Sequence, residues 1–443
     1  VVTDARNGFT PTPAVSHAIL AHNRAGTSKL ADGVVVTPSH NPPEDGGIKY
    51  NPPHGGPAEA DVAGAIETIA NILLEDGLRG VRRTPLPRPD ASEHLQLKDY
   101  RRDYVDDLTS VIDLQAVAAA DIRIGLDPLG GASIHYWPEI IERYGLNGRL
   151  VDDRLDPRFS FVPADWDGRI RMDCSSPYAM SNLVASRSEF DVAAGNDPDA
   201  DRHGIVTREG GLMHPNDFLV AAASYLFAHR SSWPIGSGIG KTMVTTRLLD
   251  RLAARLGRPL VETPVGFKWF VDGLLAGSLA FAGEESAGAS LARMDGTVWT
   301  TEKDGIVMGL LAAEMMARTG RDPAVLYRKT SEDLGASCYR RTDAPATPVQ
   351  KERLRRMAPG RLQIARLAGE PVVAIEASAP GSDAPFGGIR VQARSGWFAA
   401  RPSGTEDVYK LYAESFRGPE HLAQIEAEAK AMISVVLGGN EGG

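Results

Sequence analysis

Apolar and polar residues alternate in two patterns along residues 1–330. One pattern is a short apolar run that ends in a loop, as in residues 31–37, and it predicts a buried strand. The other places apolar side chains three and four residues apart, as in residues 57–76, and it predicts a helix with one apolar face. Further strands are predicted at residues 121–127, 190–196, 260–264 and 279–283. This alternation is typical of parallel sheets covered by helices, with functional loops at the carboxyl ends of the strands.

Residues 331–443 change to strands with few helices between them. The predicted elements are strands at 337–342, 371–376, 388–393, 397–401 and 408–415, followed by a helix at 419–437. Clustered strands of this kind predict an α+β domain with an antiparallel sheet. A linker rich in Pro and Arg at 79–90, and boundaries near 210 and 330, divide the 443 residues into four predicted domains: 1–90, 91–210, 211–330 and 331–443.

The composition excludes several classes of protein. With 48 basic and 57 acidic residues the net charge is −9, which argues against a general nucleic-acid coat because such a coat needs a basic face. The two cysteines, Cys174 and Cys338, exclude a disulfide framework and favour a reducing compartment. No apolar run approaches the ~20 residues of a membrane helix. We expect a cytoplasmic protein that binds neither nucleic acid nor membrane.

The first candidate catalytic residue lies in a loop rich in proline after the first predicted strand. This loop is TPSHNPPEDGGIKYN at 37–51. Ser39 lies near its tip, and an exposed hydroxyl with little conformational freedom suits a covalent group carrier. No GxSxG elbow surrounds it, which disfavours a hydrolase. The alternative is that Ser39 only caps a turn.

Three aspartates alternate after a later strand, in the segment GNDPDADRH. Asp197, Asp199 and Asp201 would repel one another unless a cation binds them, and oxygen ligands alone select a hard cation such as Mg²⁺. A calcium EF-hand loop is excluded because its sixth and twelfth positions would be Arg202 and Arg208. An ordinary acidic loop or helix cap is the remaining alternative.

Two further motifs could contact a polar ligand. In FAGEESAG, Glu284 and Ser286 could bind sugar hydroxyls, although a Glu here could also act as a general base or cap a helix. In RPSGTE, Arg401 begins a loop that could grip a phosphate or form a plain hairpin turn. The segment GSGIGKT at 236–242 lacks the first Gly of a nucleotide phosphate loop, and we interpret it as a turn before a strand at 242–245.

Together these motifs resemble the α-D-phosphohexomutase superfamily, and within it most closely the bacterial glucose-specific phosphoglucomutases. The run TPSHNPPEDGGIKYNPPHGGPA is the strongest match, and DPDADRHGIV, GEESAG and RPSGTEDVYKLYAES follow in the family's order. The resemblance covers essentially the whole chain. It implies three related α/β mixed-sheet domains plus a C-terminal α+β domain around a central cleft. In chain order, the domains would carry the active serine, the metal loop, the sugar-binding loop and the phosphate-binding loop.

The resemblance also implies roles for individual residues. Ser39 would carry a phosphoryl group and Lys49 would be the acid/base lysine, with a desolvated and cation-rich setting that favours its neutral form. Asp197, Asp199 and Asp201 would bind Mg²⁺ together with an oxygen of the phosphorylated Ser39. The residues implied to contact substrate are His40, Arg202, Gly266, Glu284, Ser286, Lys303, Arg401, Ser403, Gly404 and Thr405.

The implied reaction converts glucose 1-phosphate to glucose 6-phosphate through a phosphoserine and glucose 1,6-bisphosphate, under a mobile fourth domain. The partners would be small sugar phosphates, and the chain a monomer or weak homodimer. Members of the family begin with a strand and a substrate-facing Arg before the helix that follows Pro11, and this chain is expected to lack both. Members of the family that act on mannose phosphates tend to carry His at the position of Gly288, so the glycine favours specificity for glucose phosphates.

Two other functions remain open from the residues alone. One is a Mg²⁺-dependent phosphatase that uses the aspartates on a bound ester. The other is a sugar-phosphate-binding protein without catalytic activity.

Overall fold

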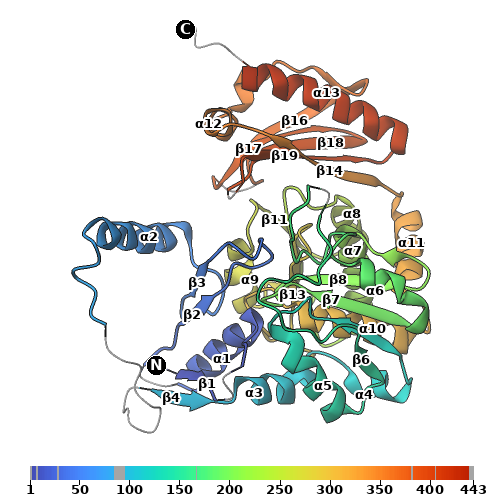
Figure 1. Ribbon diagram of the computed structural model, residues 1–443. Helices are drawn as coiled ribbons and strands as arrows, with labels where there is room; N and C mark the ends of the chain where they lie inside the picture. The colour runs from blue at the N-terminus through green and yellow to red at the C-terminus, as the bar shows by residue number, and fades with distance from the viewer. Residues whose placement is uncertain are drawn as a thin grey trace.

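The structure of the chain is a computed structural model that describes residues 2–5, 8–26, 29–83, 95–165, 167–380, 383–404 and 406–438. Figure 1 shows an N-terminal part beside a main body of two parts, with the C-terminal part above that body. The first three parts combine helices with small sheets, and the fourth is a single sheet with helices. The predicted fold class is thereby confirmed.

The N-terminal part consists of β1 (Val2–Asp4), α1 (Thr12–Arg24), β2 (Gly33–Val36), β3 (Ile48–Asn51), α2 (Ala60–Glu75) and β4 (Gln96–Lys98). β1 pairs in parallel with β4, and β2 pairs antiparallel with β3. A short strand, β1, thus precedes the first helix and pairs with β4 much later in the chain.

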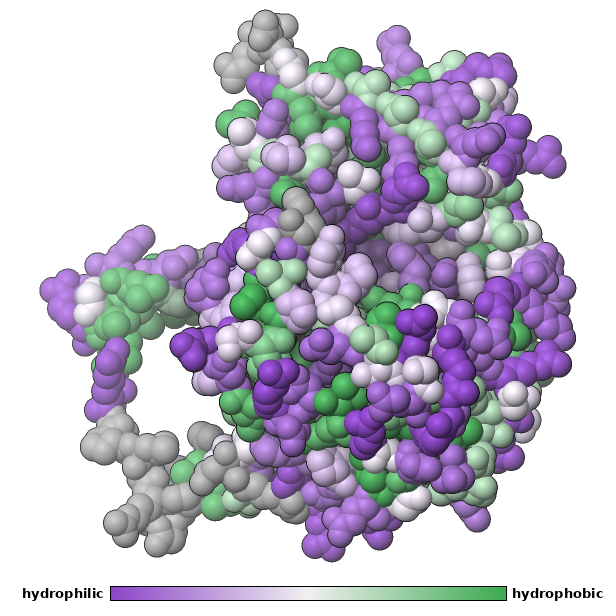
Figure 2. All heavy atoms as spheres, turned by 45° about the vertical axis from the view of Figure 1, so that its right-hand side comes forward, coloured by the Kyte–Doolittle hydropathy of each residue, from purple (hydrophilic) through white to green (hydrophobic). Residues whose placement is uncertain are grey.

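Several apolar side chains of this part are exposed, contrary to the prediction of a buried strand. In β2 only Val35 is buried, whereas Val34 is 64% and Val36 is 81% exposed. α2 forms where a helix was predicted, but none of its residues is buried, and Ile69 and Ile72 face solvent. In Figure 1, α2 stands apart from the other elements, and Figure 2 shows its apolar surface. Periodicity predicted the elements but not the burial, because it does not reveal what packs against a face.

The second part carries a five-stranded mixed sheet in the order β6-β5-β7-β8-β9. β5, β6 and β7 are parallel, and β8 and β9 continue the sheet antiparallel. The connection from β7 to β8, residues 197–202, contains the three aspartates and is called the metal loop below. The elements are α3 (Tyr100–Asp107), α4 (Leu114–Ala119), β5 (Ile124–Asp127), α5 (Tyr136–Tyr144), β6 (Gly148–Leu150), α6 (Ser181–Ala185), β7 (Val192–Asn196), β8 (His203–Thr207) and β9 (Gly211–Leu212).

The third part has a four-stranded sheet in the order β11-β10-β12-β13, in which only β13 is antiparallel to its neighbour. Its elements are α7 (Pro215–His229), β10 (Gly238–Thr242), α8 (Leu248–Leu256), β11 (Leu260–Thr263), α9 (Val271–Leu275), β12 (Leu279–Gly283), β13 (Ala289–Leu291), α10 (Gly305–Thr319) and α11 (Pro323–Leu334). The strand expected at 242–245 is displaced, because β10 occupies most of the Gly-rich segment interpreted as a turn. Its Lys241 is fully buried and paired with Asp250 and Glu262, so the segment binds no nucleotide phosphate.

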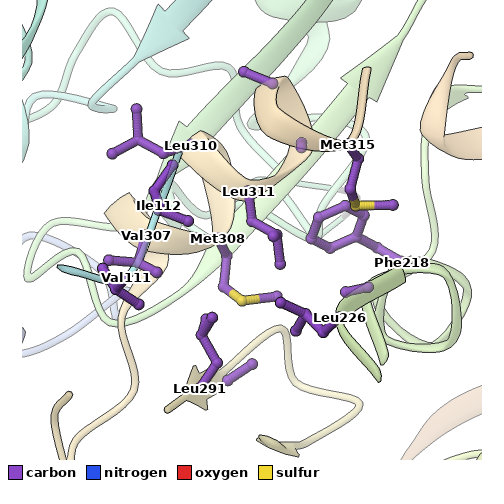
Figure 3. Close-up of a cluster of buried hydrophobic side chains, with 14 of the residues drawn as sticks. Val111, Ile112, Phe218, Leu226, Leu291, Val307, Met308, Leu310, Leu311 and Met315 are labelled. Atoms are coloured by element: carbon purple, nitrogen blue, oxygen red, sulfur yellow. The ribbon is translucent and has the colours of Figure 1, made fainter. Parts of the chain in front are cut away.

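One hydrophobic core joins the second and third parts. Helix α10 lies at its centre and is buried along nearly its whole length. Figure 3 shows Met308 and Leu311 of this helix directed toward Leu226 of α7, with Leu291 of β13 beyond Met308, whereas Val307 lies beside Val111 and Ile112. Helix α10 also packs on β7 and β8, so the two strands that flank the metal loop are held against a helix of the third part.

The C-terminal part is a six-stranded antiparallel sheet in the order β14-β19-β18-β17-β16-β15. Its elements are β14 (Cys338–Pro345), α12 (Pro348–Arg355), β15 (Arg366–Leu367), β16 (Glu370–Ser378), β17 (Pro385–Ala393), β18 (Gly396–Pro402), β19 (Val408–Ser415) and α13 (Pro419–Gly438). A short 3-10 helix at Pro359–Arg361 also belongs to this part, and others lie earlier in the chain at Leu108–Ser110, Ala132–His135, Arg187–Glu189 and Phe267–Phe270. No helix among the described residues combines the length and the apolar composition that crossing a bilayer requires.

Arg390 ties the C-terminal part to the third part. Its buried guanidinium donates to both carboxylate oxygens of Glu262 at 2.7 Å, to Glu376 at 2.8 Å and to the Met243 carbonyl at 3.1 Å. Charge-assisted bonds of this kind are the strong ones in proteins. They fix the sheet that carries the RPSGTE loop above the main body, where Figure 2 shows the surface hollowed between the two.

Candidate active site

The loop that follows β2 places the Ser39 hydroxyl next to Asp197 of the metal loop, although the two residues are far apart in the sequence. Ser39 has a φ of 57°, and its N–H donates to the Thr37 hydroxyl at 2.9 Å. A left-handed serine is unusual, and such conformations concentrate at functional sites. Its Oγ lies 3.4 Å from Oδ2 of Asp197 and 3.2 Å from Nδ1 of His40.

The three aspartates form a buried cluster in which some carboxylate oxygens lack a hydrogen-bond partner among the described residues. One carboxylate oxygen from each of Asp197, Asp199 and Asp201 lies within 4.8 Å of the other two, and all three residues are buried. Oδ1 of Asp199 and Oδ1 of Asp201 have no hydrogen-bond partner among the described residues. Burial and the two neighbouring carboxylates raise the pKa of Asp197 well above its usual range. Unpartnered buried oxygens and unfavourable charge are what a bound cation would relieve, so the residues fit Mg²⁺.

Backbone hydrogen bonds hold the metal loop from three parts of the chain. The carbonyls of three successive residues accept one N–H each. These bonds run from Ala132 N to Pro198 O at 2.6 Å, from Thr12 N to Asp199 O at 2.9 Å and from Gly305 N to Ala200 O at 2.9 Å. The donors come from the second, first and third parts in that order. The loop therefore has a fixed position relative to all three.

Two lysines reach the same carboxylates. Nζ of Lys49 lies 2.5 Å from Oδ2 of Asp199 and 3.0 Å from Oδ2 of Asp201, and Nζ of Lys303 lies 2.9 Å from the same Asp201 oxygen. Burial alone would lower the pKa of Lys49, but Asp201, Asp199 and Glu302 outweigh it and raise the pKa well above the usual value. The carboxylates around this lysine therefore favour its protonated form, not the neutral form that was expected.

Arg202 and His40 lie beside the serine. The Arg202 N–H donates to Oδ1 of Asp197 at 3.0 Å, and its Nε lies 3.8 Å from Oδ1 of Asp201. Although burial opposes the charge, Asp173, Asp201 and Asp197 raise the pKa of Arg202. Burial and Arg202 lower the pKa of His40 to about 3, so this imidazole is neutral at neutral pH. A neutral hydrogen-bonding ring thus lies beside the Ser39 hydroxyl, and a cation lies beside the Asp197 carboxylate that this hydroxyl approaches.

The predicted sugar-binding residues lie next to this cluster. Gly266 has a φ of 125°, which favours glycine, and its N–H donates to Oε1 of Glu284 at 3.0 Å. Burial raises the pKa of Glu284 against the opposing effect of Lys303. Ser286 is half-buried at the tip of the turn. His203 N donates to the Ala287 carbonyl at 3.0 Å, which joins this turn to the metal loop.

The predicted phosphate loop lies in the C-terminal part, at the connection from β18 to β19. Ser403 is buried and its hydroxyl accepts from Glu406 N at 3.3 Å, while Gly404 is exposed. Within the described residues no hydrogen bond or ion pair joins this loop to the serine and aspartate cluster. The contact with the second part runs from Arg171 to Glu406 at 3.5 Å. Thr405 lies outside the described residues.

Sequence reasoning missed two residues of the site. Lys410 pairs across the sheet with Arg401, and burial and the neighbouring Arg341 lower its pKa although Asp343 and Glu406 oppose them. The alternation along the last strand and its distance from Arg401 could have indicated it. Thr12, whose hydroxyl donates to Oδ2 of Asp199 at 3.2 Å, had no such signal, because threonines before helices are common.

Models of four protein domains match the chain in order. They describe the phosphoglucomutase/phosphomannomutase alpha/beta/alpha domains I, II and III and the C-terminal domain, and they match residues 2–75, 102–210, 214–333 and 361–432. The exact boundaries predicted from the sequence stay predictions.

Individual proteins agree with these models. The chain is 54% identical to a phosphoglucomutase of Komagataeibacter xylinus over 98% of its own length and 78% of that protein. A putative phosphomannomutase from Thermus thermophilus is 26% identical with a TM-score of 0.72, over 97% of this chain and 83% of that one. The N-acetylphosphoglucosamine mutase of Aspergillus fumigatus, solved with GlcNAc-6P and magnesium, shares the fold at 17% identity and a TM-score of 0.58, over 96% and 92% of the chains. With four domains matched in order, and more than half of its residues shared with one curated relative, this chain belongs to the phosphoglucomutase/phosphomannomutase family.

Proposed function

We propose that the chain is a phosphoglucomutase that interconverts glucose 1-phosphate and glucose 6-phosphate through phosphorylated Ser39 and glucose 1,6-bisphosphate. The observation that carries this proposal is the 3.4 Å approach of the Ser39 hydroxyl to Asp197 in a cluster of three buried carboxylates. A phosphoryl group on that hydroxyl would lie within reach of a cation held by the cluster. The high identity to a phosphoglucomutase supports glucose phosphates as substrates.

Asp197, Asp199 and Asp201 would hold Mg²⁺ together with one oxygen of phosphorylated Ser39. When bound, the ion would offset charge on the transferring phosphoryl group, whose loose transition state needs alignment and charge neutralisation. The chain's own contribution is the Arg202 guanidinium beside the same cluster. His40, neutral at neutral pH, can hydrogen-bond the Ser39 oxygen without adding charge.

The proton balance assigns a role to Lys49. When the bond between Ser39 Oγ and phosphorus breaks and the sugar oxygen bonds to phosphorus, the sugar hydroxyl loses a proton and Ser39 gains one. A lysine held protonated can donate to the departing serine oxygen and take up the sugar proton. Lys49 carries the proton that the first of these transfers needs, because Asp199 and Asp201 keep it charged.

Binding of the sugar phosphate would involve both walls of the cleft. Glu284, Ser286, Lys303 and the Gly266 loop would contact the sugar, and Gly288 favours glucose over mannose. The phosphate that is not transferred would be held by Arg401, Ser403, Gly404 and Thr405, with Lys410 as a further cation. The proposal includes a monomer or weak homodimer in the cytoplasm.

A coupled assay with glucose 1-phosphate, Mg²⁺ and a trace of glucose 1,6-bisphosphate tests the function. Ser39→Ala should abolish turnover, and normal turnover of this variant would refute the mechanism. Net release of inorganic phosphate would instead indicate a phosphatase. Intact-mass spectrometry after incubation with the bisphosphate should show one added phosphoryl group, absent in Ser39→Ala; a non-catalytic binding protein would acquire none.

A further inference from the structure

Thr12 makes two hydrogen bonds to one aspartate of the metal loop. Its N–H donates to the Asp199 carbonyl at 2.9 Å, and its Oγ1 donates to Asp199 Oδ2 at 3.2 Å. Thr12 is fully buried. The contact joins the first residue of α1 in the N-terminal part to a carboxylate in the second part.

The local sequence fixes Thr12 for this contact. Pro11 precedes it and Pro13 follows it, so the backbone on both sides has restricted freedom. The first N–H groups of a helix have no partner within the helix, and the Thr12 N–H finds its partner in the metal loop. The hydroxyl therefore meets Asp199 with little loss of entropy on binding.

The hydroxyl also decides which oxygen of Asp199 stays available. Oδ2 accepts from Thr12 and from Lys49, whereas Oδ1 is buried and has no partner among the described residues. Rotation of the carboxylate would break the Thr12 bond, so the bond holds Oδ1 in its present direction. Ligand atoms of metals are commonly oriented by such outer hydrogen bonds.

We propose that Thr12 is a positioning residue of the metal site, which holds Oδ2 of Asp199 so that Oδ1 is free to bind the cation. The inference rests on the proposed function, because it requires Asp199 to be a metal ligand. Thr12 itself touches neither the cation nor the sugar phosphate.

Binding of Mn²⁺ to the full chain without sugar phosphate tests the proposal, with free Mn²⁺ measured by electron paramagnetic resonance. Thr12→Val removes the hydroxyl and keeps the shape, and it should weaken Mn²⁺ binding by roughly tenfold or more. Thr12→Ser keeps the hydroxyl and should bind like the parent. The matched control is Ser16→Ala, one turn further along α1, whose hydroxyl lies 3.5 Å from Thr301 Oγ1 and contacts no metal-loop residue. It should also bind like the parent.

Parental Mn²⁺ affinity in Thr12→Val overturns the proposal. So does equal weakening in Thr12→Ser and Thr12→Val, which would show that the site is sensitive to any change at this position and not specifically to loss of the hydroxyl. Should Thr12→Val fail to fold by circular dichroism, Thr12→Ala replaces it with the same expectation. Failure of the proposed function is distinct: the parent itself would then bind no Mn²⁺, or Asp199→Asn would bind it as the parent does.

Discussion

Replacement of Gly288 by alanine is expected to impair catalysis through Lys303. A Cβ at Gly288 would lie 2.2 Å from Cδ and 3.0 Å from Cγ of Lys303. Only Cε separates Cδ from the ammonium group, whose Nζ lies 2.9 Å from Oδ2 of Asp201. We therefore expect the movement of Cδ that relieves the clash to displace the ammonium from Asp201.

The size of the effect follows from the distances. Ordinary contact begins at 3.4 Å, so the lysine must move by about 1.2 Å, and a displacement of about 1 Å in a catalytic site can cost roughly 100-fold in rate. Overpacking should also lower the free energy of unfolding by about 1–3 kcal/mol. We expect a kcat lower by roughly 10- to 100-fold for conversion of glucose 1-phosphate.

The assay is the initial rate of glucose 6-phosphate formation at saturating Mg²⁺, with kcat and KM determined separately. Gly236→Ala is the matched control, because a Cβ there meets nothing within 4 Å. A parental kcat in Gly288→Ala would refute the reasoning. The cause is tested in a Lys303→Ala background, where the clash is absent: if Gly288→Ala costs the same factor there, Lys303 is not the reason.

Three further predictions concern the metal, the distal phosphate and acid stability. Asp199→Asn should raise the Mg²⁺ concentration required for half-maximal rate; an unchanged requirement would contradict its role as a ligand. Arg401→Ala should raise KM for glucose 1-phosphate about tenfold or more, since a hydrogen bond to a charged group contributes about 1.5–3 kcal/mol; saturation curves that match the parent would remove it from the site. Burial alone would raise the pKa of Glu262, but Lys241 and Arg390 more than offset it and hold the pKa at about 2. The stabilisation from this group is present above pH 4.5 and lost as the pH falls toward 2, so amide protection factors from hydrogen exchange at the contact with the C-terminal part should fall in that window, unlike in Glu262→Gln.

Local motifs predicted the parts of the site that one stretch of chain can supply. Asp197, Asp199 and Asp201 alternate after an apolar strand, and that pattern alone indicates converging carboxylates. Ser39 was indicated by the prolines around it. The convergence of the carboxylates is confirmed, whereas the role of Ser39 stays a prediction that its place beside Asp197 supports. Both patterns are readable because the loop geometry is set by residues next to each other in the sequence.

The remaining features depend on contacts between distant segments. Nothing around Lys49 in the sequence reveals that carboxylates of another domain surround it, so the direction of its pKa shift was not predicted. Thr12 and Lys410 gain their importance from partners in other elements. The exposure of α2 shows the same limit, since its apolar spacing is typical of a buried helix, yet no residue of it is buried.

The three carbonyls of residues 198–200 accept hydrogen bonds from three separate parts of the chain. None of those parts alone can build the loop's geometry, so a domain released early during synthesis carries the three acidic side chains without their final arrangement. Catalytic competence is therefore acquired late, after the first three units have docked, and a partly folded chain has no working phosphoryl-transfer centre.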